Sequence, residues 1–266
     1  MTTLTLPPVF HNPLLVSECT EFDAGAERVP LAVPLRVVFP LVSNAEYEAV
    51  APQAAARAEH DAARGLANLR ASAQAAGVDL STDVRRGAEP DQEIIDEVSR
   101  SNADLLILPR RGKSGFLRRL LIGEIVGRLL DRAPCTVIVV PRLCDIWRRG
   151  VMVLVDDVDI DASTTVTSVG AAMARMANLP LSLLVASSVE EPAGLVALER
   201  IAAASGGALQ KKRVTRTDDV LNDARAAVAA GVDLLVMRNG APGTPAGDLM
   251  RQMMSANDVP VLAVRT

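Results

Sequence analysis

Aromatic residues and histidine are scarce in this chain of 266 residues. One Trp, one Tyr and four Phe, with a formal net charge of -4, leave little on which nucleic-acid bases could stack and no overall attraction for nucleic acid. The two histidines, His11 and His60, provide few candidates for a Ser-His-Asp or Cys-His site. The composition therefore argues against nucleic-acid binding and against hydrolytic triad chemistry.

Cysteine pairs and long apolar runs are also missing. Cys19, Cys135 and Cys144 include no CxxC pair, which argues against a disulfide framework and a structural zinc site. The longest apolar runs fall well short of the roughly 20 residues that a membrane helix requires. The opening residues MTTLTLPPVFHNP lack the basic start and apolar block of a secretory signal. We therefore expect a cytoplasmic protein without a membrane segment or a metal site.

An internal repeat organises the chain. "ADLLILPRRG" (103–112) is similar to "VDLLVMRNG" (232–240), and a helical segment follows each. Each helical segment leads into a run rich in β-branched residues, "CTVIVVP" (135–141) or "VPVLAV" (259–264), as expected for buried parallel strands. The repeat predicts a duplicated domain.

The spacing of single residues supports the duplication. Asp104 and Asp233 are separated by 129 residues, and so are Gly77 and Gly206, which lie in the similar segments "AAGVDL" and "ASGGAL". In "SGG" the glycine is expected to end a helix before the third strand of the second copy. This interpretation is preferred to a pyrophosphatase loop, which should follow the first strand.

Strand-like and helical runs alternate in both copies, which predicts an α/β fold with a parallel sheet covered by helices on both faces. The predicted strands of the first copy are 14–18, 35–41, 80–85, 104–108 and 136–140. Those of the second copy are 151–156, 180–186, 209–214, 233–237 and 260–264. The predicted organisation is an N-terminal extension (1–12), a first domain (13–141), a linker (142–149) and a second domain (150–266).

The first helix is expected to differ between the copies. Residues 23–34 contain two prolines, each of which removes a backbone donor and interrupts a helix, so a short helix is predicted there. Residues 162–179 contain no such interruption and predict a long helix.

Three segments resemble the universal stress protein family in its tandem, two-domain form. "RRGKSGFLRRLLIGEIVGRLLDRAPCTVIVVP" (110–141) is similar to the glycine motif G-x2-G-x9-G-[ST] of the family with its following helix and strand. Residues 13–29 are similar to the first strand, acidic tip and first helix, and residues 151–159 are similar to their counterpart in the second copy. The resemblance covers about residues 13–266.

This resemblance implies two open five-stranded parallel-sheet domains with the adenine nucleotide alpha hydrolase-like fold. ATP, when a member of the family binds it, lies at the carboxyl ends of the strands, in agreement with the general rule for open α/β sheets. The resemblance also implies that the last strands, 136–140 and 260–264, pair with each other and relate the copies by a pseudo-twofold axis. Further homodimerisation stays open.

The candidate phosphate loop of the first copy departs from the required patterns. "LPRRGKSGF" (108–116) is not a P-loop, because Ile107 occupies the position of the first glycine. The family resemblance instead gives Glu18, Gly112, Gly115 and Gly123 as nucleotide-site candidates. In that motif, however, Pro109 replaces the first glycine and offers no N–H, and Glu124 replaces the hydroxyl residue. A carboxylate about 5 Å from a phosphate charge costs roughly 3 kcal/mol at an effective dielectric constant near 20.

The second copy keeps more of the motif. Its site candidates by resemblance are Asp156, Gly240, Gly243 and Gly247. Only six residues separate the outer glycines, Pro242 and Pro245 remove two backbone donors, and Asp248 takes the hydroxyl position. Asp157 adds a negative charge after the acidic tip. We therefore expect no cofactor in either copy, with ATP or AMP as the alternative.

Three hypotheses for function follow. The first is a non-enzymatic stress-response or regulatory module whose degenerate ATP sites serve a protein partner or a smaller anion; residues 110–149, with ten Lys/Arg and three Asp/Glu, could dock an acidic partner. The second is a nucleotide-binding switch with weak ATP hydrolysis, mainly through the second copy. The third is a metal-dependent or acid–base enzyme built on Asp156, Asp157, Asp159 and Asp161. A redox role for Cys19 is a further, minor hypothesis.

Overall fold

The computed structural model describes residues 9–19, 33–75, 77–110, 125–141, 148–156, 160–187, 194–256 and 258–266. Two compact units divide the chain, Asn12–Ile146 and Trp147–Thr266, and the second also includes the residues up to His11. We call these units the first half and the second half and describe each by itself.

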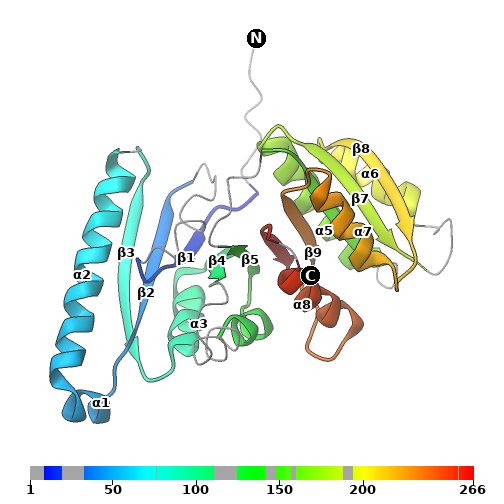
Figure 1. Cartoon of the computed structure of the whole chain (residues 1–266). Helices are drawn as coiled ribbons and strands as arrows, with labels where there is room; N and C mark the ends of the chain where they lie inside the picture. Colours follow the sequence, from blue (N-terminus) through cyan, green and yellow to red (C-terminus); the bar gives the residue numbers. More distant parts are fainter. Residues whose placement is uncertain are drawn as a thin grey trace. The chain divides into compact units, whose positions relative to one another are not determined.

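The described part of the first half contains a parallel sheet in the order β3-β2-β1-β4-β5 (Figure 1). Its strands are β1 (Pro13–Val16), β2 (Leu35–Val42), β3 (Leu80–Gly87), β4 (Leu105–Arg110) and β5 (Thr136–Pro141). Its helices are α1 (Ala45–Val50), α2 (Pro52–Ala75), α3 (Pro90–Ser101) and the helical residues 125–132.

The second half repeats this topology, with a parallel sheet in the order β8-β7-β6-β9-β10. Its strands are β6 (Val151–Asp156), β7 (Pro180–Ala186), β8 (Ala208–Thr215), β9 (Leu234–Arg238) and β10 (Val261–Val264). Its helices are α5 (Ile160–Met176), α6 (Leu195–Ala204), α7 (Val220–Ala229) and α8 (Pro245–Ala256).

The ten predicted strands are all present, and the predicted fold class is confirmed. The ends of the elements differ by a few residues: the first strand is Pro13–Val16 rather than 14–18, and α5 starts at Ile160 rather than 162. The predicted short helix within 23–34 lies outside the described residues. The predicted pairing of the last strands with each other stays a prediction.

Helices cover both faces of the first sheet. Arg86 of β3 pairs with Glu59 of α2 at 2.9 Å, whereas its neighbour Arg85 pairs with Glu93 of α3 at 3.5 Å. Because consecutive strand residues point to opposite faces, α2 and α3 lie on opposite sides of the sheet.

The second sheet is covered in the same way. Lys212 of β8 pairs with Glu199 of α6, and Arg213, the next residue, pairs with Asp223 of α7. By the same alternation, α6 and α7 cover opposite faces.

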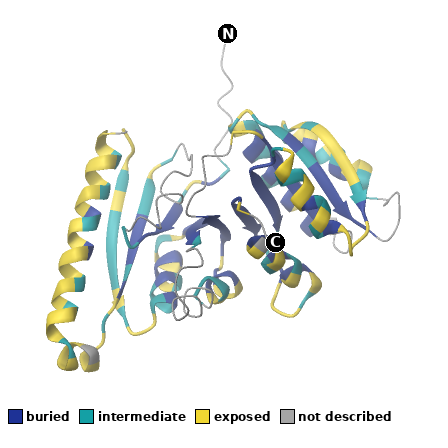
Figure 2. Ribbon diagram, viewed as in Figure 1, coloured by how far each residue is buried: buried dark blue, intermediate teal, exposed yellow. Residues whose placement is uncertain are grey.

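The buried residues of each half concentrate on the strands and on the sheet-facing sides of the helices (Figure 2). The long helix α2 is mostly exposed and buries only Ala62 and Leu66 among its described residues. Among the described residues, no helix combines the length and the apolar character needed to cross a membrane.

Asp104 and Asp233, the pair that marked the repeat, perform the same structural task. Each precedes a central strand and accepts backbone N–H groups from the start of the neighbouring strand. Oδ1 of Asp104 accepts from Asn12 N at 3.0 Å. The Asp233 carboxylate accepts from Arg148 N at 2.6 Å, Arg149 N at 2.9 Å and Gly150 N at 3.0 Å. These bonds fix the start of the first strand of each half.

Gly77 and Gly206, the second marker pair, both have a positive φ, 70° and 78°. Each follows a helix and precedes the outer strand of its half, β3 or β8. Glycine adopts this left-handed conformation without the steric penalty of a Cβ. The helix-ending role predicted for Gly206 is therefore confirmed, and the 129-residue spacing reflects equivalent positions in two copies of one fold.

The Asp233 carboxylate should contribute strongly to the stability of the second half. We expect Asp233→Ala to lower the free energy of unfolding by about 3 kcal/mol, because three backbone donors lose a charged acceptor. Asp233→Asn, which keeps one acceptor oxygen, should fall between this variant and the wild type. Urea unfolding followed by circular dichroism measures the change, with the exposed Asp218→Ala as the matched control. Equal stability of Asp233→Ala and Asp218→Ala would contradict the assignment.

Candidate functional site

The carboxyl ends of β6 and β9 form the candidate site of the second half. β6 ends at Asp156 and β9 at Arg238, and the turn 239–244 leads into α8. The predicted residues Gly240, Gly243 and Gly247 all lie in this turn and in the first turn of α8. The side chain of Asp156 lies outside the described residues.

Gly240 and Gly247 bring the turn into direct backbone contact with the start of α8. A Cβ on Gly240 would lie 2.2 Å from Gly247 N, and a Cβ on Gly247 would lie 2.1 Å from Ala241 O. No side chain fits at such distances. Both glycines are buried, so here the glycine motif holds two pieces of backbone together.

Thr244 accepts hydrogen bonds from two backbone N–H groups in the first turn of α8. Its Oγ1 accepts from Gly247 N at 3.2 Å, and its carbonyl accepts from Asp248 N at 2.9 Å. Pro245, the first helical residue, has no N–H. Thr244 therefore caps the helix, and the amides of Gly247 and Asp248 already have acceptors.

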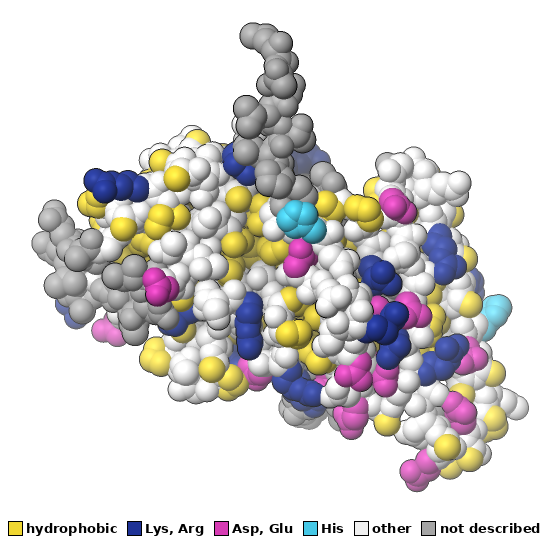
Figure 3. All heavy atoms as spheres, turned by 180° about the vertical axis from the view of Figure 1, so that it is seen from behind, with side chains coloured by type: hydrophobic (Ala, Val, Ile, Leu, Met, Phe, Trp, Pro, Cys, Tyr) yellow, Lys and Arg dark blue, Asp and Glu magenta, His cyan; other side chains and the backbone are white. Residues whose placement is uncertain are grey.

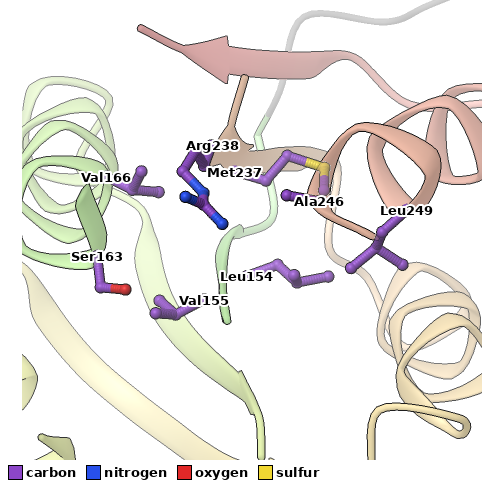
Figure 4. A pocket seen from close by; sticks show the side chains of 8 residues that line it. All are labelled: Leu154, Val155, Ser163, Val166, Met237, Arg238, Ala246 and Leu249. Atoms are coloured by element: carbon purple, nitrogen blue, oxygen red, sulfur yellow. The ribbon is translucent and has the colours of Figure 1, made fainter. Parts of the chain in front are cut away.

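The hollow beside this turn is very small. Its volume is about 10 Å³, enough for one water molecule. Leu154, Val166 and Leu249 give it apolar walls, and the Arg238 side chain extends into it between the two helices (Figure 4). This hollow, as the described residues form it, is too small for a nucleotide.

Asp248 and Gly243 lie on the outer side of the turn. Asp248 is exposed in the first turn of α8, where a carboxylate interacts favourably with the helix dipole. The carboxylate of Asp248 thus lies near the position at which the family motif has a hydroxyl residue. Gly243 has a φ of 73°, and a Cβ added to it would meet no described atom within 4 Å.

In the first half, Glu18 lines a hollow of about 140 Å³ at the carboxyl ends of β1, β2 and β4. The other lining residues are apolar, among them Val16, Leu108 and Pro109. The volume falls below the roughly 300–1,000 Å³ typical of small-molecule sites. Glu18 is therefore at the predicted end of the sheet, in apolar surroundings.

Cys19 adopts a conformation that favours glycine, with a φ of 53°. Its N–H is donated to Ser17 Oγ at 2.9 Å. A Cβ on Gly65 of α2 would lie only 2.5 Å from Cys19 Cβ. The missing side chain at Gly65 thus makes room for the Cβ that Cys19 adds at the end of the first strand.

Two basic residues of segment 110–149 are committed to an internal ion pair. The carboxylate of Asp91, in the first turn of α3, is buried. It accepts from Arg128 Nε at 2.9 Å and Nη2 at 3.0 Å, and from Arg132 Nη1 at 3.1 Å. These bonds attach the helical residues 125–132 to α3. Acidic and basic side chains also lie among one another on the surface in Figure 3.

Comparison with known proteins identifies the family. Residues 27–141 match the model of the universal stress protein family. The first half of the chain therefore contains a domain of the universal stress protein family. The chain is 32% identical over 77 residues to a universal stress protein of Methanocaldococcus jannaschii, a match that spans 29% of this chain and less than half (44%) of that protein.

Two solved structures of low sequence identity share the fold over nearly the whole chain. One is a universal stress protein from Archaeoglobus fulgidus, with a TM-score of 0.66, 16% identity and coverage of 97% of this chain and 96% of that one. The other is a protein of unknown function from Pseudomonas aeruginosa PAO1, with a TM-score of 0.63, 14% identity and coverage of 96% and 92%. These likenesses concern the fold.

The structure does not place the remaining candidate residues of the universal stress protein motif. Gly112, Gly115, Gly123 and Glu124 lie outside the described residues. The same holds for Asp157 and Asp159 of the carboxylate hypothesis, while Asp161 is exposed in α5. Across the described part of the chain, no three His, Cys, Asp or Glu side chains are grouped closely enough to hold a metal ion.

Two residues of the second site, Arg238 and Thr244, were not predicted from the sequence. The 129-residue spacing aligns Arg238 with Pro109, so the signal available was an arginine directly after a buried run, where the first copy has a proline. Thr244 precedes Pro245, and a Thr-Pro pair before an apolar periodic segment is a recognisable helix start.

The backbone contact between Gly240 and Gly247 can be tested by adding a methyl group. We expect Gly247→Ala to lower the free energy of unfolding by about 3 kcal/mol, because the added Cβ overlaps Ala241 O. Gly243→Ala, in open space, should cost only about 1 kcal/mol for its positive φ. Thermal and urea unfolding of both variants give the comparison. Equal costs would show that the turn does not pack against α8 as described.

Proposed function

We propose that this protein is a non-enzymatic stress-response or regulatory module whose two ancestral ATP sites no longer hold a triphosphate. Its output would be the binding of a protein partner or of a small anion other than a nucleotide. The observation that carries this proposal is the close backbone contact of Gly240 with Gly247. A loop in such contact with its helix cannot also surround a phosphate chain.

The hydrogen bonds of the turn support the same conclusion. In a phosphate-binding loop, backbone N–H groups at a helix start point at the anion. Here Gly247 N is bonded to Thr244 Oγ1, and Pro245 has no N–H. A phosphate would therefore have to displace the helix cap, which is worth roughly 1 kcal/mol, before it gained these donors.

Electrostatics oppose a triphosphate at the same place. Asp248 carries a carboxylate in the first turn of α8. Repulsion between this group and a phosphate about 5 Å away amounts to roughly 3 kcal/mol at an effective dielectric constant near 20. In the first half, Glu18 adds a negative charge to a hollow that is otherwise apolar among its described residues.

Only part of the basic segment 110–149 is a candidate surface for binding an acidic protein partner. Arg128 and Arg132 are engaged with Asp91, and Arg149 lies 3.7 Å from the Asp233 carboxylate. A docking surface for an acidic partner would therefore draw on basic residues of that segment other than these three. We also propose that the last strands of the two halves, β5 and β10, pair with each other, which would make the chain a pseudo-dimer. We further propose that the protein acts in the cytoplasm, in keeping with this regulatory role.

A nucleotide-binding switch with weak ATP hydrolysis, acting through the second half, is the alternative. The observation in its favour is Arg238, whose side chain enters the small hollow at the end of β9 (Figure 4). An arginine at this end of the sheet is suited to bind a phosphate if the turn opens.

Nucleotide content and titration decide between the two functions. We expect the purified full chain to release no stoichiometric nucleotide on denaturation, as read by mass spectrometry. Calorimetric titration with ATP, ADP, AMP and cyclic dinucleotides, with and without Mg²⁺, should give no saturable heat, because the donors are occupied and Asp248 repels the phosphates.

Bound ATP or AMP would contradict the proposal. In that event, Arg238→Met should weaken binding about tenfold or more if the switch acts through the second half. The exposed Arg225→Met on α7 is the matched control and should leave the affinity unchanged.

A further inference from the structure

A second, larger cavity lies toward the amino ends of the strands in the second half. Its volume is about 440 Å³, within the roughly 300–1,000 Å³ range of small-molecule sites. It lies between α7 and the strands β6, β7 and β8, near Gly150, Pro180 and Val232. The turn with Gly240 is at the other end of the same strands, so this cavity is distinct from the ancestral nucleotide site.

In the first half, an ionic cluster around the buried carboxylate of Glu97 occupies the corresponding position. Glu97 of α3 is fully buried and accepts hydrogen bonds from Arg100 Nε and Nη2, both at 2.9 Å. Arg36 of β2 lies 3.9 Å from the same carboxylate. Hydrogen bonding to Glu97 raises the pKa of the Arg100 guanidinium.

The helix ends identify the residue that replaces Glu97. Asn102 and Gly231, 129 residues apart, both end their helices with positive φ, 52° and 116°. The residue after each donates its N–H five residues back, to Val98 O and Ala227 O respectively. Ala226 is therefore the counterpart of Glu97.

The strand register identifies the residue that replaces Arg36. Arg36 is paired with Leu14 of β1, and Ser182 is paired with Met152 of β6. Leu14 and Met152 are equivalent because each is paired with the second residue of the following central strand, β4 or β9. Glu97 and Arg36 of the first half thus correspond to Ala226 and Ser182 of the second half. Because the second pair is smaller, a space remains between α7 and the sheet where α3 packs closely in the first half.

The cavity is lined by apolar side chains on the sheet side and by charged side chains. Met152 and Leu184 are buried beneath it. Arg213 pairs with Asp223 at 2.8 Å, while the second carboxylate oxygen of Asp223, Oδ2, is buried and receives no hydrogen bond in the described structure. A buried acceptor without a donor costs about 1–3 kcal/mol, so a ligand donor at this oxygen would be favourable.

Lys211 supplies an uncompensated positive charge. It lies two residues before Arg213 on β8, so both side chains are on the face that α7 covers. Among the described residues it forms no ion pair, whereas Lys212 on the opposite face pairs with Glu199. An ammonium group beside an apolar floor is suited to the carboxylate of an amphipathic molecule.

From these features we infer that the second half binds a small amphipathic hydroxycarboxylate in the cavity between α7 and β6–β8. The carboxylate interacts with Lys211, the hydroxyl donates to Asp223 Oδ2, and the apolar body covers Met152 and Leu184. The site is independent of the ancestral nucleotide site, and ATP titration of the same samples tests the proposed function separately.

Three related compounds test the inference on the full chain by calorimetric titration. Hydroxyoctanoate supplies the charge, the donor and the apolar body; octanoate lacks the hydroxyl donor, and hydroxyoctanamide lacks the negative charge. We expect saturable binding of hydroxyoctanoate, several-fold weaker binding of octanoate and about tenfold weaker binding of hydroxyoctanamide. No saturable binding of hydroxyoctanoate, or equal binding of all three, would overturn the inference.

Matched variants locate the site. Lys211→Gln should weaken hydroxyoctanoate binding about tenfold, and Lys212→Gln, the adjacent lysine on the other face, less than twofold. Ala226→Leu should abolish binding by filling the space that Glu97 fills in the first half. Circular dichroism and the Tm show whether each variant is folded. If Ala226→Leu does not fold, Lys211→Gln still tests the inference, because Lys211 is exposed and its substitution should not disturb the fold. If Lys211 serves only to protect the edge strand β8 from pairing, both lysine variants will bind alike, and the inference fails.

Discussion

The backbone contact between Gly240 and Gly247 is the constraint on which the functional account depends. Glycines in a phosphate loop allow the backbone to approach a ligand, and here they allow it to approach itself. Once the turn has closed, Thr244 can cap α8 and Arg238 has only a small hollow to enter. Glycine therefore permits nucleotide binding in an open loop, whereas in this shortened loop it allows a backbone contact that excludes the nucleotide.

The two halves keep what the parallel sheet needs and differ where helices meet it. Asp104 and Asp233 hold the starts of the first strands, and Gly77 and Gly206 end equivalent helices. By contrast, the buried Glu97 of one half has Ala226 as its counterpart in the other. The two halves thus share the residues that the backbone of the sheet requires and differ at the helix–sheet interface, where a smaller side chain leaves a cavity without disrupting the sheet.

The sequence was sufficient to predict the ten strands, because β-branched runs and a 129-residue repeat are local and periodic signals. It also indicated a damaged glycine motif, since six residues between Gly240 and Gly247 are too few for the family pattern. It could not show that these two glycines touch, because a contact distance depends on the path of the turn between them. Arg238 was missed since its direction depends on where α5 and α8 pack. The cavity beside α7 could not be predicted either, because its lining residues, such as Ser182 and Ala226, are far apart in the chain.

Amide NMR of the turn after β9 tests the closed loop most directly. The Gly240 and Gly247 amide resonances should not shift when Mg²⁺-ATP is added to the full chain, and the Gly247 amide, bonded to Thr244 Oγ1, should exchange slowly with solvent. Fast exchange of Gly247 together with ATP-dependent shifts of both glycines would show an open, functioning phosphate loop and would contradict the account.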